Sequence, residues 1–234
     1  KIHKNRRRNK IIMKILHILA QLPVKTGSGV YFTNVIEGLE SFNHEQAALY
    51  GTSPEHNFNI LDTVYEVEFE GKDLDFPIVG MSDIMPYNNT LYKDMTEEMV
   101  NSWEKAFREK LLKAKEEFNP DVVITHHLWI LSSIVCEIFN DKKIIGVCHN
   151  TDIRQAEKNP VMKEKYVLNL GKLDKILALS SGQIDEIAEE FNYPKENIIN
   201  LGAGYNEKVF FPLKEYPKKD KVEIVYAGKF DESK

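Results

Sequence analysis

The chain of 234 residues is long enough for one large domain, and its 42% hydrophobic and 29% charged residues are typical of a globular protein. No apolar run approaches the roughly 20 residues that a membrane-spanning helix needs, and the N-terminal pattern is not that of a secretory signal. The net charge is −5, but residues 1–12 carry six basic and no acidic side chains, which leaves −11 for the rest. A body this acidic disfavours nucleic acid as a partner.

Residues 1–12 are expected to form a disordered basic leader ahead of a true start at Met13. Contact of this leader with anionic lipid or RNA is the alternative. Cys136 and Cys148 are widely spaced in apolar runs, which indicates buried thiols in a reducing compartment and neither a disulfide nor a metal site. We therefore expect a cytoplasmic protein, with peripheral contact to the inner face of a membrane left open.

The stretch 13–38 predicts a strand, a loop and a helix. Residues 14–20 (KILHILA) suit a buried parallel strand, and apolar residues recur at helical spacing from Val30 onward. The glycines in 26–29 (TGSG) let the chain turn tightly, and a helix N-terminus behind such a loop attracts a phosphate or another anion. A loop that merely turns is equally compatible. NAD binding is disfavoured, because Phe32 replaces the third glycine of the dinucleotide fingerprint and no acid ends the second strand.

Strands and helices alternate along the rest of the chain. We expect strands at 45–51, 62–69, 121–127, 143–148, 174–179 and 197–201, with helices at 96–118, 128–139, 160–170 and 183–191. This βα alternation predicts an α/β fold with a mostly parallel, doubly wound Rossmann-like sheet that carries helices on both faces, and 62–69 is a candidate edge strand. Residues 71–89 lack periodicity, and their apolar part at 76–87 either lines a substrate cleft or packs on the sheet edge.

Unusual polar groups follow the predicted strands at their carboxyl ends, which is where parallel sheets bind ligands. They are the 26–29 turn, His126-His127, 149–152 (HNTD) and Ser180-Ser181. Structural roles compete with binding at each of these places. We expect His126 to point to the opposite face from His127, Asp152 and one of the two serines to cap helices, and His17 to be a core histidine.

The last part of the chain predicts a second domain. Residues 210–220 are a charged linker with two prolines, and 222–227 have the pattern of a fresh strand with no helix after it. The expected domains are therefore the leader at 1–12, a Rossmann-like domain at 13–209, the linker at 210–220, and at 221–234 the first strand of a truncated second domain.

These pieces resemble the N-terminal half of the retaining glycosyltransferases of family four, which have the GT-B architecture, over roughly residues 14–234. The segments that carry the resemblance are 27–29 (GSG), 120–129 (PDVVITHHLW), 149–152 (HNTD), 180–181 (SS), 202–212 (GAGYNEKVFFP) and 227–234 (AGKFDESK). The family's usual acid is missing near 202–206. Lys229 stands where the family has arginine, so it neutralises a phosphate without the bidentate fork.

The resemblance implies a nucleotide-sugar-dependent, hexosyltransferase-like enzyme of which this chain is the acceptor-binding half. It gives His127 the catalytic contact with the transferred sugar and needs no metal and no cofactor. The implied substrate-binding residues are Gly27, Ser28, Gly29, His149, Asn150, Thr151 and Ser180, and the residues implied to bind the donor diphosphate are Lys229 and Lys234.

The same resemblance implies a donor linked to UDP or GDP and an acceptor that is a lipid, a polysaccharide or a small metabolite. The truncated chain is expected to be inactive by itself, because the donor-binding half is absent from it. The alternative is a non-catalytic α/β module that binds a nucleotide or another anionic small molecule at the same edge of the sheet.

Overall fold

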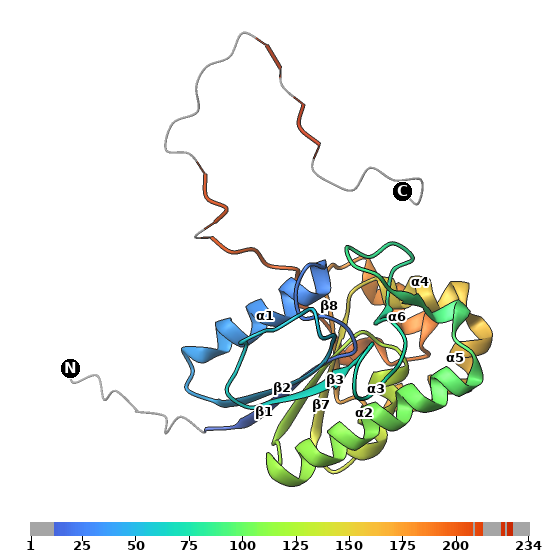
Figure 1. The fold of residues 1–234 in the computed structure, drawn as a ribbon. Coiled ribbons are helices and arrows are strands. Elements are labelled where there is room, and N and C mark those ends of the chain that lie inside the picture. The colour runs from blue at the N-terminus through green and yellow to red at the C-terminus, as the bar shows by residue number, and fades with distance from the viewer. Residues whose placement is uncertain (1–11, 208, 213–220, 223, 227–234) are drawn as a thin grey trace. The chain divides into compact units, whose positions relative to one another are not determined.

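The structure is a computed structural model that describes residues 12–207, 209–212, 221–222 and 224–226 (Figure 1). The chain divides into two units, 1–203 and 204–234, and every helix and strand of the described residues lies in the first. The strands are β1 (Lys14–Leu19), β2 (Glu45–Thr52), β3 (Val64–Glu68), β4 (Val79–Gly80), β5 (Thr90–Leu91), β6 (Val122–His126), β7 (Lys143–Cys148), β8 (Lys175–Ala178) and β9 (Ile198–Asn200). The helices are α1 (Gly27–Glu40), α2 (Glu97–Glu117), α3 (Ile130–Ile138), α4 (Thr151–Lys158), α5 (Pro160–Tyr166) and α6 (Gln183–Glu190), with 3₁₀ turns η1 (Tyr92–Asp94), η2 (Leu170–Lys172) and η3 (Lys195–Asn197).

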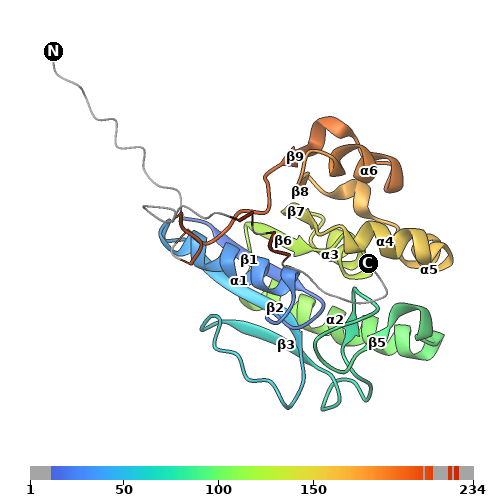
Figure 2. The same ribbon diagram turned by 90° about the horizontal axis from the view of Figure 1, so that it is seen from above.

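A seven-stranded sheet forms the centre of the first unit, with the order β3-β2-β1-β6-β7-β8-β9 that can be followed in Figure 2. All six neighbouring pairs are parallel, which confirms the predicted doubly wound architecture, and β3 lies at an edge. The chain builds outward from β1 in both directions, so the order reverses between β1 and β6. Open parallel sheets bind ligands outside the carboxyl ends of the strands at such a switch point.

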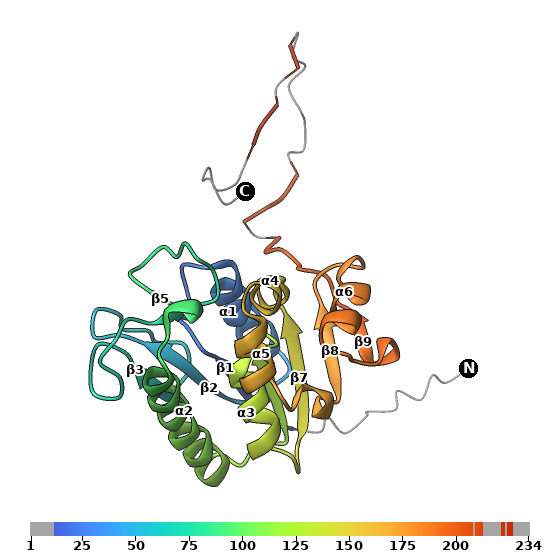
Figure 3. The ribbon, with the colours of Figure 1, turned by 90° about the vertical axis from the view of Figure 1, so that its right-hand side faces the viewer.

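The two faces of the sheet are covered unequally. On one face α1 packs Phe32 and Ile36 against Leu19, Ala48 and Tyr50. On the other face the helices α2 to α6 share one large apolar cluster with the alternate positions of the strands, including Leu16 and Ile18 of β1. Figure 3 shows α2, α3 and α5 next to one another on that face. Alternation along β1 therefore places His17 on the α1 side of the sheet, where its ring contacts Phe32.

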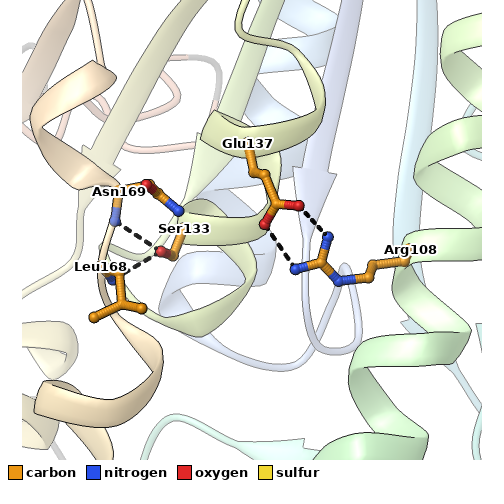
Figure 4. A network of polar contacts seen from close by, with 5 residues as sticks. All are labelled: Arg108, Ser133, Glu137, Leu168 and Asn169. Atoms are coloured by element: carbon orange, nitrogen blue, oxygen red, sulfur yellow. Dashed lines mark hydrogen bonds and ion pairs between the residues drawn. The ribbon is translucent and has the colours of Figure 1, made fainter.

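Polar contacts connect helix α3 to α2 and to the segment that follows α5 (Figure 4). Arg108 of α2 donates two hydrogen bonds, of 2.9 and 2.8 Å, to the carboxylate of Glu137. The buried hydroxyl of Ser133 accepts from the backbone N–H groups of Leu168 and Asn169, each at 2.9 Å. These contacts set the position of the segment between α5 and β8 against the core.

The helix boundaries correct the sequence analysis in two places. Helix α1 begins at Gly27, three residues earlier than Val30, because Thr26 Oγ1 accepts from the N–H of Gly29 at 3.0 Å and caps the helix. The predicted loop at 27–29 is thus the first turn of that helix. Helix α4 was given no range, although the expected cap at Asp152 implied a helix after that residue, and the helix expected at 160–170 is the shorter α5 followed by η2.

Other expectations fall on the irregular and the last parts of the chain. Residues 76–87 include Phe76, Ile78 and Met81, which are buried in the large core cluster, so this part of the segment packs against the sheet. A strand at 222–227 stays a prediction, because residues 222 and 224–226 have no strand pairing and the others lie outside the described residues. Within the described residues, none of the helices combines the length and apolar composition needed to cross a bilayer.

Candidate active site

The start of α1 forms the first part of the candidate site, directly after the carboxyl end of β1. A Cβ at Gly29 would lie 2.7 to 2.8 Å from backbone atoms of residues 22–24, so only glycine lets the helix start this close to the preceding turn. A Cβ at Gly27 would meet nothing within 4 Å. The first backbone N–H groups of a helix have no partner inside it, and here they belong to a turn with open space beside it.

The histidine cluster forms the second part, where β6 and β7 end side by side. His126 Nδ1 and His149 Nε2 lie 3.0 Å apart and share one hydrogen bond. The ring centroid of His149 is 5.2 Å from that of His126 and 4.7 Å from that of His127. Tyr31 and Phe32 of α1 contact the same rings, with centroids 5.4 Å from His149 and 5.2 Å from His126. The cluster therefore joins α1 to the ends of two strands.

His126 and His127 were expected on opposite faces, and that prediction is wrong. His127 has φ 67°, a left-handed conformation that turns the chain as soon as β6 ends, so strand alternation no longer applies. Both rings consequently approach His149. His126 is fully buried and His127 is 3% exposed.

Asp152 connects the two histidine turns. Its carboxylate is fully buried and accepts from the backbone N–H of Leu128 at 2.8 Å and from that of His149 at 3.0 Å. The expected helix cap is wrong, because Asp152 is the second residue of α4, and Asn150, at the N-cap position, has φ 68° and makes no capping bond through its side chain. Burial raises the pKa of Asp152 to about 6. The side chain holds the turn after β6 and the turn after β7 together.

Burial keeps the histidines neutral at pH 7. It lowers the pKa of His17 and of His149 to about 4. The pKa values of His126 and His127 are lowered well below 6.5, first by burial and then by the neighbouring rings. Nε2 of His127 is buried without a hydrogen-bond partner among the described residues, while Nδ1 lies 3.4 Å from the hydroxyl of Thr151. A neutral His127 offers a hydrogen bond, and not a positive charge, to a bound molecule.

Two glutamine side chains that the sequence analysis did not single out, those of Gln21 and Gln155, connect parts of the site by hydrogen bonds. Gln21 donates to the hydroxyl of Ser28 at 2.8 Å, and its carbonyl accepts from the N–H of Met81 at 3.3 Å. Gln155 of α4 donates to the carbonyl of Met81 at 2.9 Å. The first turn of α1, the segment around Met81 and α4 are therefore tied together at one edge of the sheet, although they are 60 and 74 residues apart in the sequence.

The predicted site residues are placed as follows. His127 and the half-buried His149, Asn150 and Thr151 come together where β6 and β7 end, and α1 contacts this cluster through Tyr31 and Phe32, one turn after Gly27. Ser180 is exposed after β8, two strands away from β6, and the described residues show no contact between it and the histidines.

The expected capping serine is also wrong, since α6 begins after Gly182 with no side-chain cap. Lys229 and Lys234 lie outside the described residues. Among the residues that the structure describes, no group of three His, Cys, Asp or Glu side chains is arranged to hold a metal ion.

Solved structures with the same fold bind or convert sugar compounds according to their titles. Sucrose-phosphate synthase from Thermosynechococcus elongatus aligns with a TM-score of 0.58 and 13% identity over 86% of this chain and 50% of its own. A putative UDP-N-acetylglucosamine 2-epimerase from Listeria monocytogenes aligns with a TM-score of 0.52 and 10% identity, over 80% of this chain and 44% of its own. The Neisseria meningitidis UDP-GlcNAc 2-epimerase bound to UDP-GlcNAc aligns with a TM-score of 0.50 and 11% identity, over 80% of this chain and 46% of its own. These likenesses show the fold, and the chain spans about half the length of the structures it matches.

The fold is thus that of a Rossmann-like domain of GT-B proteins. A search of curated proteins found no match. The model of Glycosyltransferase Family 4 matches residues 92–203, a segment that runs from η1 through β9 and contains the histidine turns. The match and the fold together confirm the predicted resemblance to a family-four glycosyltransferase domain of the GT-B type.

Proposed function

We propose that this chain is the acceptor-binding half of a retaining, hexosyltransferase-like enzyme that uses a nucleotide-sugar donor. The observation that supports the proposal is that His127 packs against His149 after the adjacent strands β6 and β7, while α1, which follows the neighbouring β1, contacts the same rings through Tyr31 and Phe32. The family match over 92–203 supports sugar transfer in preference to the other activities that occur on this fold.

The open side of Gly27 suits the diphosphate and sugar of a donor. None of the described residues fills the space beside Gly27, and its φ is not in the left-handed region, so neither packing against them nor backbone strain requires glycine there. Close approach of a ligand is a physical reason for leaving out a side chain. The helix N-terminus adds roughly 0.3–1 kcal/mol of attraction for an anion.

His127 is proposed to act as a neutral hydrogen-bonding group beside the reacting carbon. Its Nε2 has no partner among the described residues, and Thr151 and His149 lie against the other side of the ring. A fixed dipole in a buried site stabilises charge that develops in the transition state better than water does, because it needs no reorganisation. The proposed roles of Lys229 and Lys234 at the departing diphosphate complement this contact.

Because the chain spans about half the length of its structural neighbours, we propose that transfer also needs a donor-binding half. A UDP-linked donor is favoured over a GDP-linked one by the neighbour that was solved with UDP-GlcNAc. No transfer is expected from the 234 residues by themselves, and steady transfer by them would contradict this part of the proposal.

The test is a mass-spectrometric screen of nucleotide sugars and acceptors, with the protein that carries this domain together with its donor-binding half. Gly27→Val is the informative variant, because its Cβ would meet no atom of the described residues within 4 Å while its side chain enters the space proposed for the donor. We expect it to lower transfer at least about tenfold, or about 1.4 kcal/mol, with an unchanged melting temperature. Gly38→Ala is the matched control, since Gly38 lies in the same helix and a Cβ there also meets nothing within 4 Å.

Three outcomes of the same screen would contradict parts of the proposal. Full transfer by Gly27→Val would place the donor elsewhere. Binding of nucleotide without transfer to any acceptor would favour a non-catalytic module, and a 2-epimerised sugar nucleotide formed without an acceptor would favour an epimerase.

A further inference from the structure

A groove lies at the end of α4 that is farther from the histidine cluster. It has a volume of about 410 Å³ and is bounded by η1 and the start of α2 on one side and by the junction of α4 and α5 on the other. Its size is within the usual range for small-molecule sites. None of the residues assigned above to the candidate active site lines it.

The groove combines an apolar wall with a cationic rim. Met95, Val100, Val161, Met162 and Tyr166 supply the apolar wall. Val161, the second residue of α5, is 77% exposed, so it offers apolar area that the rest of the described chain leaves uncovered.

Three lysines and one acid are the charged residues of the lining, and the lysines are Lys93, Lys158 and Lys165. The acid, Glu97, accepts from Lys165 at 2.8 Å, and Lys158 pairs with Asp83 at 2.6 Å. Lys93 is exposed and forms no ion pair within the part of the chain that the structure describes. Exposed ion pairs contribute only about 0–1 kcal/mol, so an incoming anion can compete for these ammonium groups. The charge of the rim therefore complements an anion.

Helix α4 links this groove to the candidate active site. Thr151 begins the helix next to His127, and Lys158 ends it at the groove. Eight residues of α-helix span about 12 Å, so one elongated molecule can reach from the groove to the histidine cluster. Asp152 and Gln155 anchor the helix between these ends, which fixes the separation.

We infer that the groove binds an anionic amphiphile, with an apolar body against Val161 and Tyr166 and a phosphate or carboxylate at Lys93. The inference rests on the proposed function in one respect, which is that the bound molecule is the acceptor and places its reactive end beside His127. It narrows the acceptor to molecules that carry an acidic group and an apolar part about 12 Å from the hydroxyl that receives the sugar.

The test is calorimetric titration of the full chain, without any donor, using octyl phosphate, octanoate, octyl glucoside and inorganic phosphate as probes. We expect octyl phosphate or octanoate to bind at least about tenfold more tightly than the uncharged octyl glucoside and than inorganic phosphate. The comparison of the two charged probes tells whether a phosphate or a carboxylate is preferred. Equal binding of octyl glucoside, or no binding of either charged probe, would overturn the inference.

Two variants locate the bound probe. Lys93→Gln should weaken the charged probes several-fold and leave octyl glucoside unchanged, and Val161→Ser should weaken binding by about tenfold, the loss expected for one buried valine. Both side chains are exposed, so neither change is expected to unfold the chain. Lys113→Gln, at an exposed position in the second half of α2, is the matched charge control. Unaltered binding in both groove variants would place the probe elsewhere.

The outcome is separable from that of the proposed function. If the charged probes bind in the groove while Gly27→Val retains full transfer, the groove stands and the proposed donor position fails. If the probes do not bind while Gly27→Val abolishes transfer, the proposed donor position stands and the groove inference fails.

Discussion

Acidification from pH 6.5 to pH 4 should strongly destabilise this domain, because the folded chain buries four histidine rings in their neutral form. His17 and His149 have pKa values of about 4 in the folded chain, against an ordinary value of 6.5. Between these two pH values the unfolded chain binds a proton at each site and the folded chain does not. Stability that is fully present above pH 6.5 is therefore lost as the pH falls toward 4, by about 3 kcal/mol for each of the two residues. His126 and His127 shift in the same direction and add to the loss.

Asp152 opposes this trend. Its pKa is raised to about 6 by burial, so the folded chain takes up a proton there before the unfolded chain does. Acidification from pH 6 to pH 4 consequently returns about 2 kcal/mol. The stability lost through His17 and His149 is larger than the stability gained through Asp152. The net loss of at least about 3 kcal/mol is a large part of the 5–15 kcal/mol that usually separates folded and unfolded states.

The assay is urea unfolding at a series of pH values, followed by the fluorescence of the fully buried Trp103 and Trp129. The free energy of unfolding should fall from pH 6.5 to pH 4 in the wild type. In His149→Asn the fall should be smaller by about 3 kcal/mol, because one shifted group is gone. A free energy of unfolding that is flat across this range, or a slope that His149→Asn leaves unchanged, would refute the reasoning.

Four substitutions test the packing that supports the site, with the melting temperature and urea unfolding as readouts. Gly29→Ala should destabilise the chain by about 1–3 kcal/mol, because the added carbon would lie 2.7 Å from the backbone of Val24, and wild-type stability would show that α1 is not held this closely. Gly38→Ala, by contrast, should be neutral or stabilise by up to about 1 kcal/mol through helix propensity, and a loss would contradict the open space beside it. Asp152→Ala leaves two backbone N–H groups without their acceptor and should cost about 2–5 kcal/mol, whereas a loss under 1 kcal/mol would mean that water replaces the carboxylate. Arg108→Ala removes an exposed ion pair and should cost no more than about 1 kcal/mol, with a larger loss indicating that this pair positions α3.

The strand and helix order was predictable because the apolar runs of this chain are regular. Buried strands such as β1 and β7 read directly as apolar stretches, and α2 shows its core face as Trp103, Phe107 and Leu111. Parallel pairing then follows from the βα alternation. The convergence of the polar turns at one edge follows in turn from the parallel sheet, which is why the glycine turn, His127 and the 149–152 turn could be expected together.

The apolar pattern of the sequence did not indicate the range of helix α4, because half of the residues on its buried face are polar. Its buried residues are Asp152, Ile153, Gln155 and Ala156, so the apolar periodicity that reveals a helix is interrupted where the side chains bond to distant backbone groups. Those partners come from other turns of the fold. No local pattern carries that information, and the same holds for the link from Gln21 to Met81.

The turn at His127 was missed for a different reason. The strand pattern continues in the sequence to position 127, but the left-handed backbone of His127 ends the alternation one residue earlier. A positive φ at a residue other than glycine is set by its surroundings, here by the bond from its following N–H, that of Leu128, to Asp152. The resulting approach of three imidazoles is therefore a property of the folded chain only.

The most direct test is a nuclear magnetic resonance titration with UDP-GlcNAc of the ¹⁵N-labelled protein that carries this domain together with its donor-binding half. We expect the amide signals of Gly27, Leu128 and Asn150 to shift together along one binding curve, because the first turn of α1 and the two histidine turns are proposed to border one site. We also expect that Gly27→Val abolishes all three shifts, while Gly38→Ala preserves them. Shifts confined to other parts of the sheet, or three signals that follow unrelated curves, would contradict the claim that these turns form a single site.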